Sequence, residues 1–226
     1  MLGNVLYINC LDQAAVLADV MGDTDKAESY RETAATAREA WNEFFIDPDT
    51  GKTKNIKGEI QDTQASYATP LRFHVVSDEN LEKVLENYNA TIAEASGEDS
   101  DGMPIVPYTL TTGFNATGNL LNALSDYGLN DTAYKLFEST DYASWLYPVT
   151  QGATSIWERW NGYTNELGFN GNNSMNSFNH YSLGAVYEWM VAYQLGIKSD
   201  ETQQMELVAG TYHFEVTDGN VTVTAA

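Results

Sequence analysis

The chain has 226 residues, 43% of them hydrophobic, which is enough to bury the core of one large domain or of one domain with a small appendage. It carries 11 Lys and Arg against 32 Asp and Glu, a formal net charge of -21, and such a field repels nucleic acids and anionic membrane surfaces. The single cysteine, Cys10, excludes an intrachain disulfide and a cysteine cluster for a metal, and we expect it to be a small buried residue on a helix.

The N-terminal stretch "MLGNVLYINCLDQAAVLADV" has an apolar run that Asn9 and Asp12 interrupt, without the basic residues that begin a secretory signal peptide. We therefore expect a soluble protein with neither a signal peptide nor a membrane-spanning helix here. An acidic chain is compatible with the bacterial cytoplasm, the periplasm and the extracellular space. The sequence leaves the compartment open.

The first half of the chain has the three-and-four apolar spacing of amphipathic helices. This spacing predicts four helices, over residues 11–21, 23–45, 60–76 and 77–97. Gly22 separates the first two, and Asp23 or Thr24 is placed to cap the second. We expect these two helices to form an antiparallel hairpin.

The second half of the chain alternates long loops with helices. Residues 114–128 predict a helix that Gly128 ends, and residues 177–196 predict another. The loop at 97–113 is rich in Gly, Pro and acidic residues, and the segment 142–176 is rich in aromatic residues, Gly and Asn. Long loops on a rigid helical framework are where sites are usually built.

The tail changes to the alternating pattern of β-strands. The stretch "TYHFEVTDGNVTVTA" alternates β-branched and aromatic residues around an Asp-Gly turn, which predicts a hairpin. We therefore predict a mainly α chain, an array of helix hairpins with a short C-terminal β-hairpin appendage. Helix–loop–helix units of about 30–45 residues are the size expected of a helical solenoid or toroid, which we favour over an irregular bundle.

Aromatic and amide side chains alternate between Tyr142 and Tyr181. Flat rings stack on the apolar faces of sugars, while amides and carboxylates bind hydroxyl groups. The composition fits a carbohydrate site as well as a structural aromatic cluster. Its members include Trp145, Trp157, Trp160, Tyr163, Phe169, Phe178, Asn161, Asn165, Asn170, Asn172, Asn173, Asn176 and Asn179.

Glu158 lies in "GATSIWERWNGY", between Trp157 and the pair Arg159 and Trp160. A carboxylate between aromatic walls is suited to act as an acid or a base. The alternative is a Glu–Arg ion pair within a core, because ion pairs are common in helical proteins. The residues alone leave both interpretations open.

His180 comes four residues before Gly184 and eight before Glu188, so the three would share one face of the predicted helix. It could donate a hydrogen bond to a ligand hydroxyl or to a loop carbonyl. We expect His74, in a predicted helix, and His213, in the predicted tail strand, to be structural. No two histidines have metal-ligand spacing and no phosphate-binding loop is present, so we expect neither a metal ion nor an organic cofactor.

Four blocks of the chain follow one another in the order "DTQASYATPL", "LTTGFNATGNLLNALSDYGLNDTAYKLF", "YASWLYPVTQGATSIWERWNGY" and "MNSFNHYSLGAVYEWM". In this order and spacing they resemble the catalytic domain of the α-L-rhamnosidases of glycoside hydrolase family 78, from about residue 11 to residue 197. The block "GATSIWERW" followed by "MNSFNHY" is the most specific part of the resemblance.

The resemblance implies an (α/α)6 toroid of paired helices and an inverting hydrolysis that releases terminal α-L-rhamnose from glycosides or polysaccharides. It implies that Glu158 is the general base and that His180 lies at the sugar. It implies neither a metal nor an organic cofactor. The further residues that it implies in substrate binding, or in support of the pocket, are Trp145, Trp157, Trp160, Arg159 and Asn179.

One part of the family pattern is missing from this chain. Family members place the general acid in an Asp/Arg/Glu-rich motif in the first half of the toroid, and the chain resembles the second half. We expect residues 1–197 to be part of the catalytic domain and residues 198–226 a remnant of the family's C-terminal β-domain. A homo-oligomer, or a separate N-terminal half, would cover the exposed helix faces.

Two other functions stay open on the sequence. A non-catalytic carbohydrate-binding or structural remnant would keep the aromatic pocket without turnover. A different helical-toroid glycosidase would act on another sugar, with its acid supplied by Asp62, Asp141 or Glu166.

Overall fold

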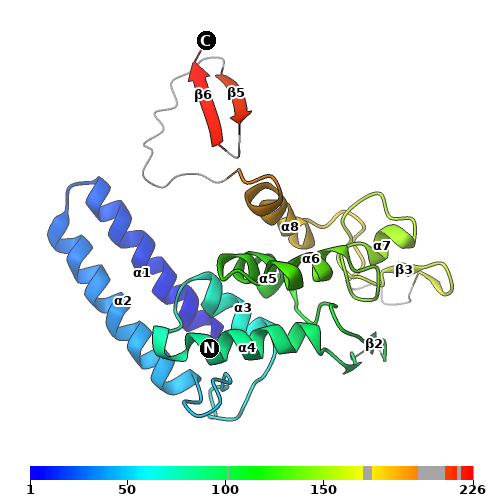
Figure 1. Ribbon diagram of the computed structural model, residues 1–226, viewed down its shortest axis with the longest axis horizontal. Coiled ribbons are helices and arrows are strands. Elements are labelled where there is room, and N and C mark those ends of the chain that lie inside the picture. Colours follow the sequence, from blue (N-terminus) through cyan, green and yellow to red (C-terminus); the bar gives the residue numbers. More distant parts are fainter. Residues whose placement is uncertain (101, 170–174, 198–211, 218–219, 226) are drawn as a thin grey trace.

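Paired helices make up most of the chain in its computed structural model (Figure 1), as predicted. The structure describes residues 1–100, 102–169, 175–197, 212–217 and 220–225, the last two ranges for the backbone only. The helices are α1 (Leu2–Val20), α2 (Thr24–Phe45), α3 (Gln64–Arg72), α4 (Asp78–Ala93), α5 (Phe114–Asp126), α6 (Asn130–Glu138), α7 (Tyr147–Thr150), the 3-10 turn η1 (Ser182–Ala185), α8 (Val186–Trp189) and the π-helical turn η2 (Met190–Gln194).

The strands form three antiparallel pairs, each from neighbouring parts of the chain. They are β1 (Gly97–Glu98) with β2 (Pro104–Ile105), β3 (Tyr163–Thr164) with β4 (Gly168–Phe169), and β5 (Tyr212–Thr217) with β6 (Asn220–Ala225). The backbone of the last pair confirms the predicted tail hairpin. Its Asp-Gly turn lies outside the described residues.

Helices α1 and α2 form the predicted antiparallel hairpin, although α1 already begins at Leu2. Gly22, with φ at +78°, allows the turn, and the Asp23 carboxylate accepts a hydrogen bond from the Lys26 backbone N–H at 3.2 Å, so Asp23 is the cap. Small side chains let the two helices approach closely: Ala15, Ala18, Ala27 and Ala34 are buried. Cys10 is exposed, contrary to expectation, because it lies off the buried stripe of α1.

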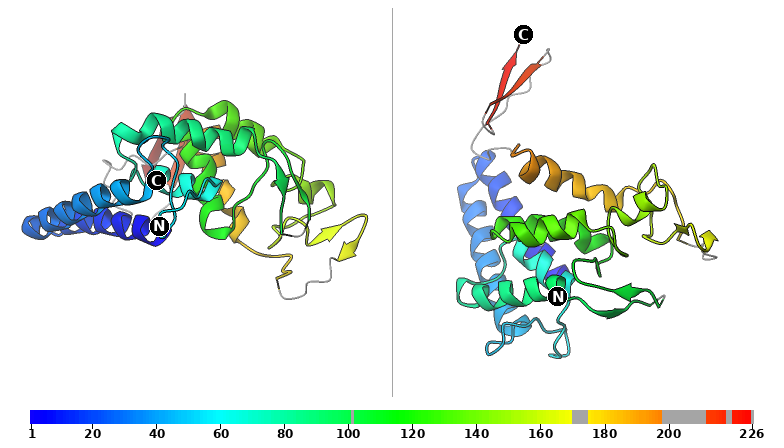
Figure 2. Two further views of the ribbon diagram at one scale, coloured as in Figure 1. Left: turned by 90° about the horizontal axis from the view of Figure 1, so that it is seen from below. Right: turned by 45° about the vertical axis from the view of Figure 1, so that its right-hand side comes forward.

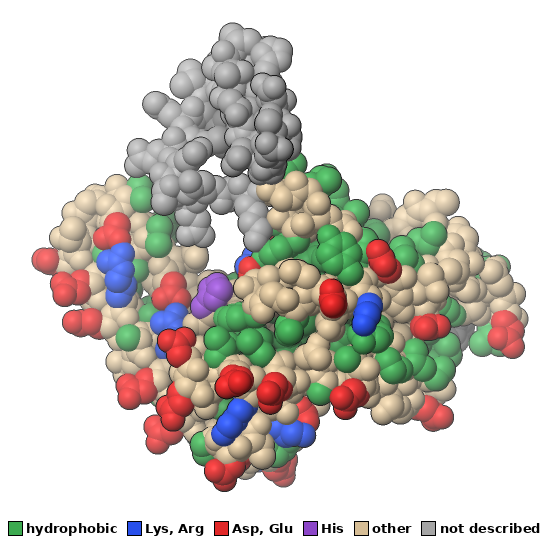
Figure 3. All heavy atoms as spheres, in the orientation of Figure 1, with side chains coloured by type: hydrophobic (Ala, Val, Ile, Leu, Met, Phe, Trp, Pro, Cys, Tyr) green, Lys and Arg blue, Asp and Glu red, His purple; other side chains and the backbone are tan. Residues whose placement is uncertain are grey.

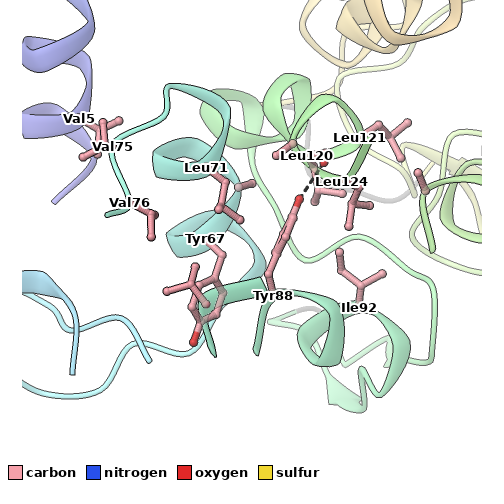
Figure 4. Packing of buried hydrophobic residues seen from close by; sticks show 14 of the residues in the cluster. Val5, Tyr67, Leu71, Val75, Val76, Tyr88, Ile92, Leu120, Leu121 and Leu124 are labelled. Atoms are coloured by element: carbon pink, nitrogen blue, oxygen red, sulfur yellow. Dashed lines mark hydrogen bonds between the residues drawn. The ribbon is translucent and has the colours of Figure 1, made fainter. Parts of the chain in front are cut away.

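Helices α3, α4 and α5 enclose the central core (Figure 4). Each contributes a stripe of fully buried side chains, and each such side chain stabilises the fold by about 1.5–3 kcal/mol. The Tyr88 hydroxyl on α4 donates a hydrogen bond to the carbonyl oxygen of Leu120 on α5 at 2.8 Å. The stripes are Tyr67 and Leu71, Val84, Tyr88 and Ile92, and Leu120, Leu121 and Leu124.

The predicted helix 60–76 is shorter in the structure, because its first residues pair elsewhere and its last residues turn away. Residues 60–63 precede α3, and the Gln61 N–H donates to the Thr53 carbonyl at 2.8 Å instead of entering a helix. Beyond α3 the chain turns at His74, whose φ is +51°. His74 is therefore not helical; its Nδ1 lies 3.2 Å from the Tyr127 hydroxyl.

Gln64 ties the loop before α5 to the core. Its buried amide donates to the carbonyl of Thr109 at 2.8 Å and accepts from the backbone N–H of Thr111 at 2.9 Å. This loop leads directly to Phe114, the first residue of α5. The core of the helical array thereby fixes where Phe114 stands.

The loop-rich region lies at the opposite end of the molecule from the α1–α2 hairpin, as Figure 2 shows from two sides. It holds residues 142–169, including α7 and the β3–β4 pair. Acidic side chains are spread widely over the face seen in Figure 3. Within the described residues, no helix combines the length and the hydrophobicity needed to cross a membrane.

We predict that Gln64→Leu lowers the free energy of unfolding by about 2–3 kcal/mol, because it leaves the buried carbonyl of Thr109 without a donor. Chemical denaturation followed by circular dichroism measures the change. Gln13→Leu, on the exposed side of α1, is the matched control and should change the stability little. Equal effects of both variants would contradict the role of Gln64.

A second prediction concerns alkaline pH. Burial raises the pKa of Tyr88 well above its usual value of 10.0, and burial together with the hydrogen bond to Asp62 raises that of Tyr67. Because the folded pKa values exceed the unfolded ones, stability is complete below pH 10 and falls as the pH rises above it. Each such tyrosine contributes a loss of about 1.4 kcal/mol per pH unit.

Tyr88→Phe should therefore flatten the decline of stability above pH 10. Denaturation curves at pH 8 measure the lost hydrogen bond to Leu120 separately. An unchanged slope above pH 10 would show that Tyr88 ionises within the fold.

Candidate active site

Backbone hydrogen bonds join the segment that carries Glu158 to the segment that carries His180. The Glu158 backbone N–H donates to the Ser177 carbonyl at 2.9 Å, and the His180 N–H donates to the Ile156 carbonyl at 2.9 Å. These hydrogen bonds join two segments that are far apart in the sequence. They bring the Glu158 and His180 side chains together.

The same pairing replaces the first part of the predicted helix 177–196. Helical structure begins only at Ser182, so His180 precedes it and the predicted face of His180, Gly184 and Glu188 does not form. The backbone N–H of His180 is committed to the other segment and cannot bond within a helix. Glu188 instead forms an ion pair with Arg72 at 3.0 Å.

One oxygen of the Glu158 carboxylate is hydrogen-bonded to the backbone. Its Oε2 accepts a hydrogen bond from the Ser177 backbone N–H at 2.9 Å. Its Oε1 lies 3.9 Å from His180 Nε2, too far for a direct hydrogen bond. The side chains of Glu158 and His180 are 16% and 23% exposed, so both remain accessible to a small ligand. One hydroxyl group beside them could contact both.

The His180 ring is oriented from several directions. It stacks on Phe114, with centroids 4.7 Å apart and planes at 18°, and on Tyr181, at 5.4 Å and 5°. Its Nδ1 accepts a hydrogen bond from the Ser182 backbone N–H at 3.3 Å. In the neutral imidazole this assigns the proton to Nε2, which faces Glu158.

A cavity of about 280 Å³ opens beside Glu158. Its size is close to the lower limit of ligand pockets, about 300 Å³. Arg159 Nη2 donates to the Oδ1 of the buried Asn161 at 3.1 Å, and Trp160 packs edge-on against Trp145 at 6.0 Å. The described residues that line it are Asp99, Ser100, Thr112, Gly113, Phe114, Tyr142, Glu158, Arg159, Trp160, Asn161, Met175 and Leu183.

Two of the predicted tryptophans lie behind the cavity wall. Trp145 is 8% exposed and donates from Nε1 to the Leu183 carbonyl at 2.9 Å. Trp157 is 7% exposed and packs edge-on against Phe178 at 5.2 Å. Both therefore support the segments that carry the cavity.

Asn179 is exposed, and its backbone N–H donates to Ser177 Oγ at 3.2 Å. It is not among the described residues that line the cavity. Three asparagines of the predicted cluster, Asn170, Asn172 and Asn173, lie outside the described residues.

Sequence reasoning missed the residues that loops bring to the cavity from elsewhere. Asp99 accepts hydrogen bonds from the Tyr142 hydroxyl at 2.6 Å and from the Met103 backbone N–H at 2.9 Å. Nothing local marks Asp99 among its acidic neighbours. Phe114 could have been found, because it follows Gly113 within one of the blocks that resemble the rhamnosidases.

None of the three carboxylates considered as alternative acids is among the described residues that line the cavity. Asp62 pairs with Lys52 and accepts from the Tyr67 hydroxyl at 2.5 Å, beside α3. Asp141 and Glu166 are exposed, and neither lines the cavity in the described part of the chain. Across the same described ranges, no three His, Cys, Asp or Glu side chains are grouped so as to hold a metal ion.

The chain is similar to known α-L-rhamnosidases over most of its length. Residues 1–193 match the family described as the bacterial alpha-L-rhamnosidase 6 hairpin glycosidase domain. An alpha-L-rhamnosidase of Formosa agariphila is 34% identical over 197 residues, 87% of this chain and 19% of the relative. One of Streptomyces avermitilis is 34% identical over 191 residues, 84% of this chain and 16% of the relative.

Solved structures show the same likeness. The Streptomyces avermitilis alpha-L-rhamnosidase complexed with L-rhamnose has a TM-score of 0.70 at 32% identity, over 86% of this chain and 17% of that one. The native enzyme of Aspergillus terreus has a TM-score of 0.69 at 27% identity, over 82% and 19%. This chain spans less than a fifth of the length of these relatives. It belongs to the family of bacterial α-L-rhamnosidase six-hairpin glycosidase domains.

Proposed function

We propose that this chain is part of a glycoside hydrolase that releases terminal α-L-rhamnose from glycosides or polysaccharides with inversion, and that Glu158 is its general base. One observation carries the proposal: Glu158 lines a cavity and its Oε1 lies 3.9 Å from His180 Nε2, in a chain that matches α-L-rhamnosidases. Its substrate would be a rhamnose-containing glycoside or polysaccharide.

Glu158 would act on water. The Ser177 N–H holds Oε2, so Oε1 would remain to take a proton from a water molecule as its oxygen attacks the anomeric carbon. The bond to the leaving oxygen then breaks, and a second carboxyl group protonates that oxygen from the other side of the sugar. In inverting enzymes the two carboxyl groups stand about 6.5–9.5 Å apart, which leaves room for the water.

His180 would hold the sugar next to Glu158. Its Nε2–H would donate to a rhamnose hydroxyl, and stacking on Phe114 would keep the ring in place. Trp160 and Arg159, which line the cavity, would contact the sugar, and Trp145 and Trp157 would support them from behind. Asn179 would contact the sugar only at the rim of the cavity, because it is exposed.

Asp99 is the carboxylate that shares the cavity with Glu158 among the described residues. It accepts hydrogen bonds on each of its oxygens, from Met103 and Tyr142, so it is arranged as an acceptor for a sugar hydroxyl rather than as a proton donor. The proton for the leaving oxygen would then come from another group. For this reason the second candidate function is carbohydrate binding without turnover.

Further parts of the domain would cover apolar side chains that are exposed in this chain. Leu17, Val20 and Met21 are exposed at the end of the α1–α2 hairpin, and apolar side chains exposed together mark a surface for association. We propose that further helix hairpins, or a second copy of the chain, cover them. We propose further that residues 1–197 are part of the catalytic domain and residues 198–226 a remnant of a C-terminal β-domain.

The first test is hydrolysis of p-nitrophenyl α-L-rhamnoside. If the chain is active, Glu158→Gln should lower kcat by at least about 100-fold, because it removes the base and keeps the size of the side chain. Glu166→Gln, on a nearby exposed loop outside the cavity, is the matched control and should retain activity. Full activity of Glu158→Gln would refute the assignment. L-rhamnose binding without turnover by the unaltered chain would favour the second candidate function.

A separate prediction concerns the affinity for L-rhamnose, measured by calorimetry. His180→Ala should weaken binding about 2- to 12-fold, the effect of one neutral hydrogen bond. His74→Ala is the control, because His74 is exposed and contacts Tyr127 at a distant position. Unchanged affinity in His180→Ala would contradict a contact between His180 and the sugar.

A further inference from the structure

Helix α5 packs against the segment that begins at His180. Phe114, the first residue of α5, stacks on the His180 ring with centroids 4.7 Å apart. Near the other end of α5, Ser125 Oγ accepts a hydrogen bond from Trp189 Nε1 at 2.9 Å. The turn η1 lies between His180 and Trp189 in the chain and also contacts α5. The place of the His180 ring therefore depends on how closely η1 approaches α5.

Gly118 faces η1, one turn of α5 after Phe114. A Cβ atom built on Gly118 would lie 3.1 Å from the Cβ of Ala185, whereas carbon atoms that are not bonded prefer a separation of about 3.5–4.0 Å. Among the described residues beyond α5, no other heavy atom comes within 4 Å of that position. A methyl group on Gly118 would therefore require η1 and α5 to separate by a few tenths of an ångström.

The helix itself gives no reason for a glycine at this position. Gly118 lies in the interior of α5, where alanine is more favourable than glycine. Its backbone is helical, so it does not adopt the left-handed conformation that favours glycine. The close contact with Ala185 is the feature that a side chain would disturb. Gly118 therefore serves the packing of η1 on α5.

A separation of η1 from α5 would be felt at the His180 end of the segment. Trp189 is 1% exposed and is bound to Ser125, so the far end is fixed in the core. Tyr181, next to His180, is 87% exposed, so little packing opposes a movement at the near end. The His180 N–H is bound to the Ile156 carbonyl, so His180 would move away from α5 and stay with the Glu158 segment.

We propose that Gly118 is a positioning residue, whose missing side chain lets η1 pack closely on α5 and thereby stacks the His180 ring on Phe114. Its role in sugar binding rests on the proposed function. The stacked ring has its Nε2 3.9 Å from Glu158 Oε1, where one hydroxyl group could contact both. A ring without this support would adopt other orientations and would hold the hydroxyl group less firmly.

The test compares Gly118→Ala with the unaltered chain by proton NMR of the histidine rings and by calorimetry with L-rhamnose. Stacking on an aromatic ring shifts the carbon-bound ring protons of His180 upfield, and their resonances are assigned by their loss in His180→Gln. We expect Gly118→Ala to move these resonances downfield, because the rings separate. We expect it also to weaken L-rhamnose binding about 2- to 12-fold, the range of one neutral hydrogen bond.

Two variants separate positioning from a general loss of structure. Combining Gly118→Ala with Ala185→Gly removes the facing methyl group and should restore both the resonances and the affinity. Gly3→Ala, in α1, adds the same methyl group where the described residues leave open space, and it should change neither. Circular dichroism verifies that each variant is folded. His74, which contacts Tyr127 instead, supplies reference resonances.

Unchanged His180 resonances in Gly118→Ala would overturn the inference, and so would a failure of Ala185→Gly to restore them. A Gly118→Ala chain that does not fold would also contradict it, because the strain would then lie in the core. Shifted resonances beside an unchanged affinity for L-rhamnose would refute the role in sugar binding. If the unaltered chain binds no L-rhamnose while the resonances respond as expected, the proposed function fails and the placement of His180 by Gly118 stands.

Discussion

The pairing of the Glu158 segment with the His180 segment is the constraint on which the site depends. Backbone hydrogen bonds of 2.9 Å join Glu158 to Ser177 and His180 to Ile156, and the Glu158 carboxylate closes a third bond to Ser177. Backbone pairing fixes the course of the chain more firmly than a single ion pair between long side chains, which costs side-chain entropy and contributes little energy. In the proposed function, Glu158 and His180 would therefore need no rearrangement before they act on the sugar.

The helical array supports this pairing from outside. The stripes of α3, α4 and α5 form the core, and Gln64 binds the loop that ends at Phe114. Phe114 then stacks on the His180 ring. On the other side Trp145 binds the Leu183 carbonyl next to the start of η1. Core packing therefore reaches the site through two aromatic contacts, and the cavity is a consequence of where the helices end.

The aromatic residues divide into those that are buried in the framework and those that line cavities or are exposed beside them. Trp145 and Trp157 are buried and hold neighbouring segments, whereas Trp160 lines the cavity and Tyr181 stands exposed beside it. Composition could not make this division, because a tryptophan in a core and a tryptophan under a sugar look the same in sequence. Carboxylates divide similarly, since Asp99 enters the cavity while Asp62 joins Lys52 beside α3.

The sequence by itself determined the helix hairpins, the tail hairpin and the family, because local spacing and ordered blocks carry these features. It left the cap of α2 open between Asp23 and Thr24, and the structure decided for Asp23. The sequence also singled out Glu158 and His180. Only the tertiary structure decided that His180 precedes its helix and that Asp99 and Phe114 reach the cavity. Helical periodicity describes the partners a residue has within one turn. The backbone hydrogen bonds that Glu158 and His180 make to the opposite segment are non-local. They prevent a helix at His180, and the spacing of apolar residues along the sequence does not reveal them.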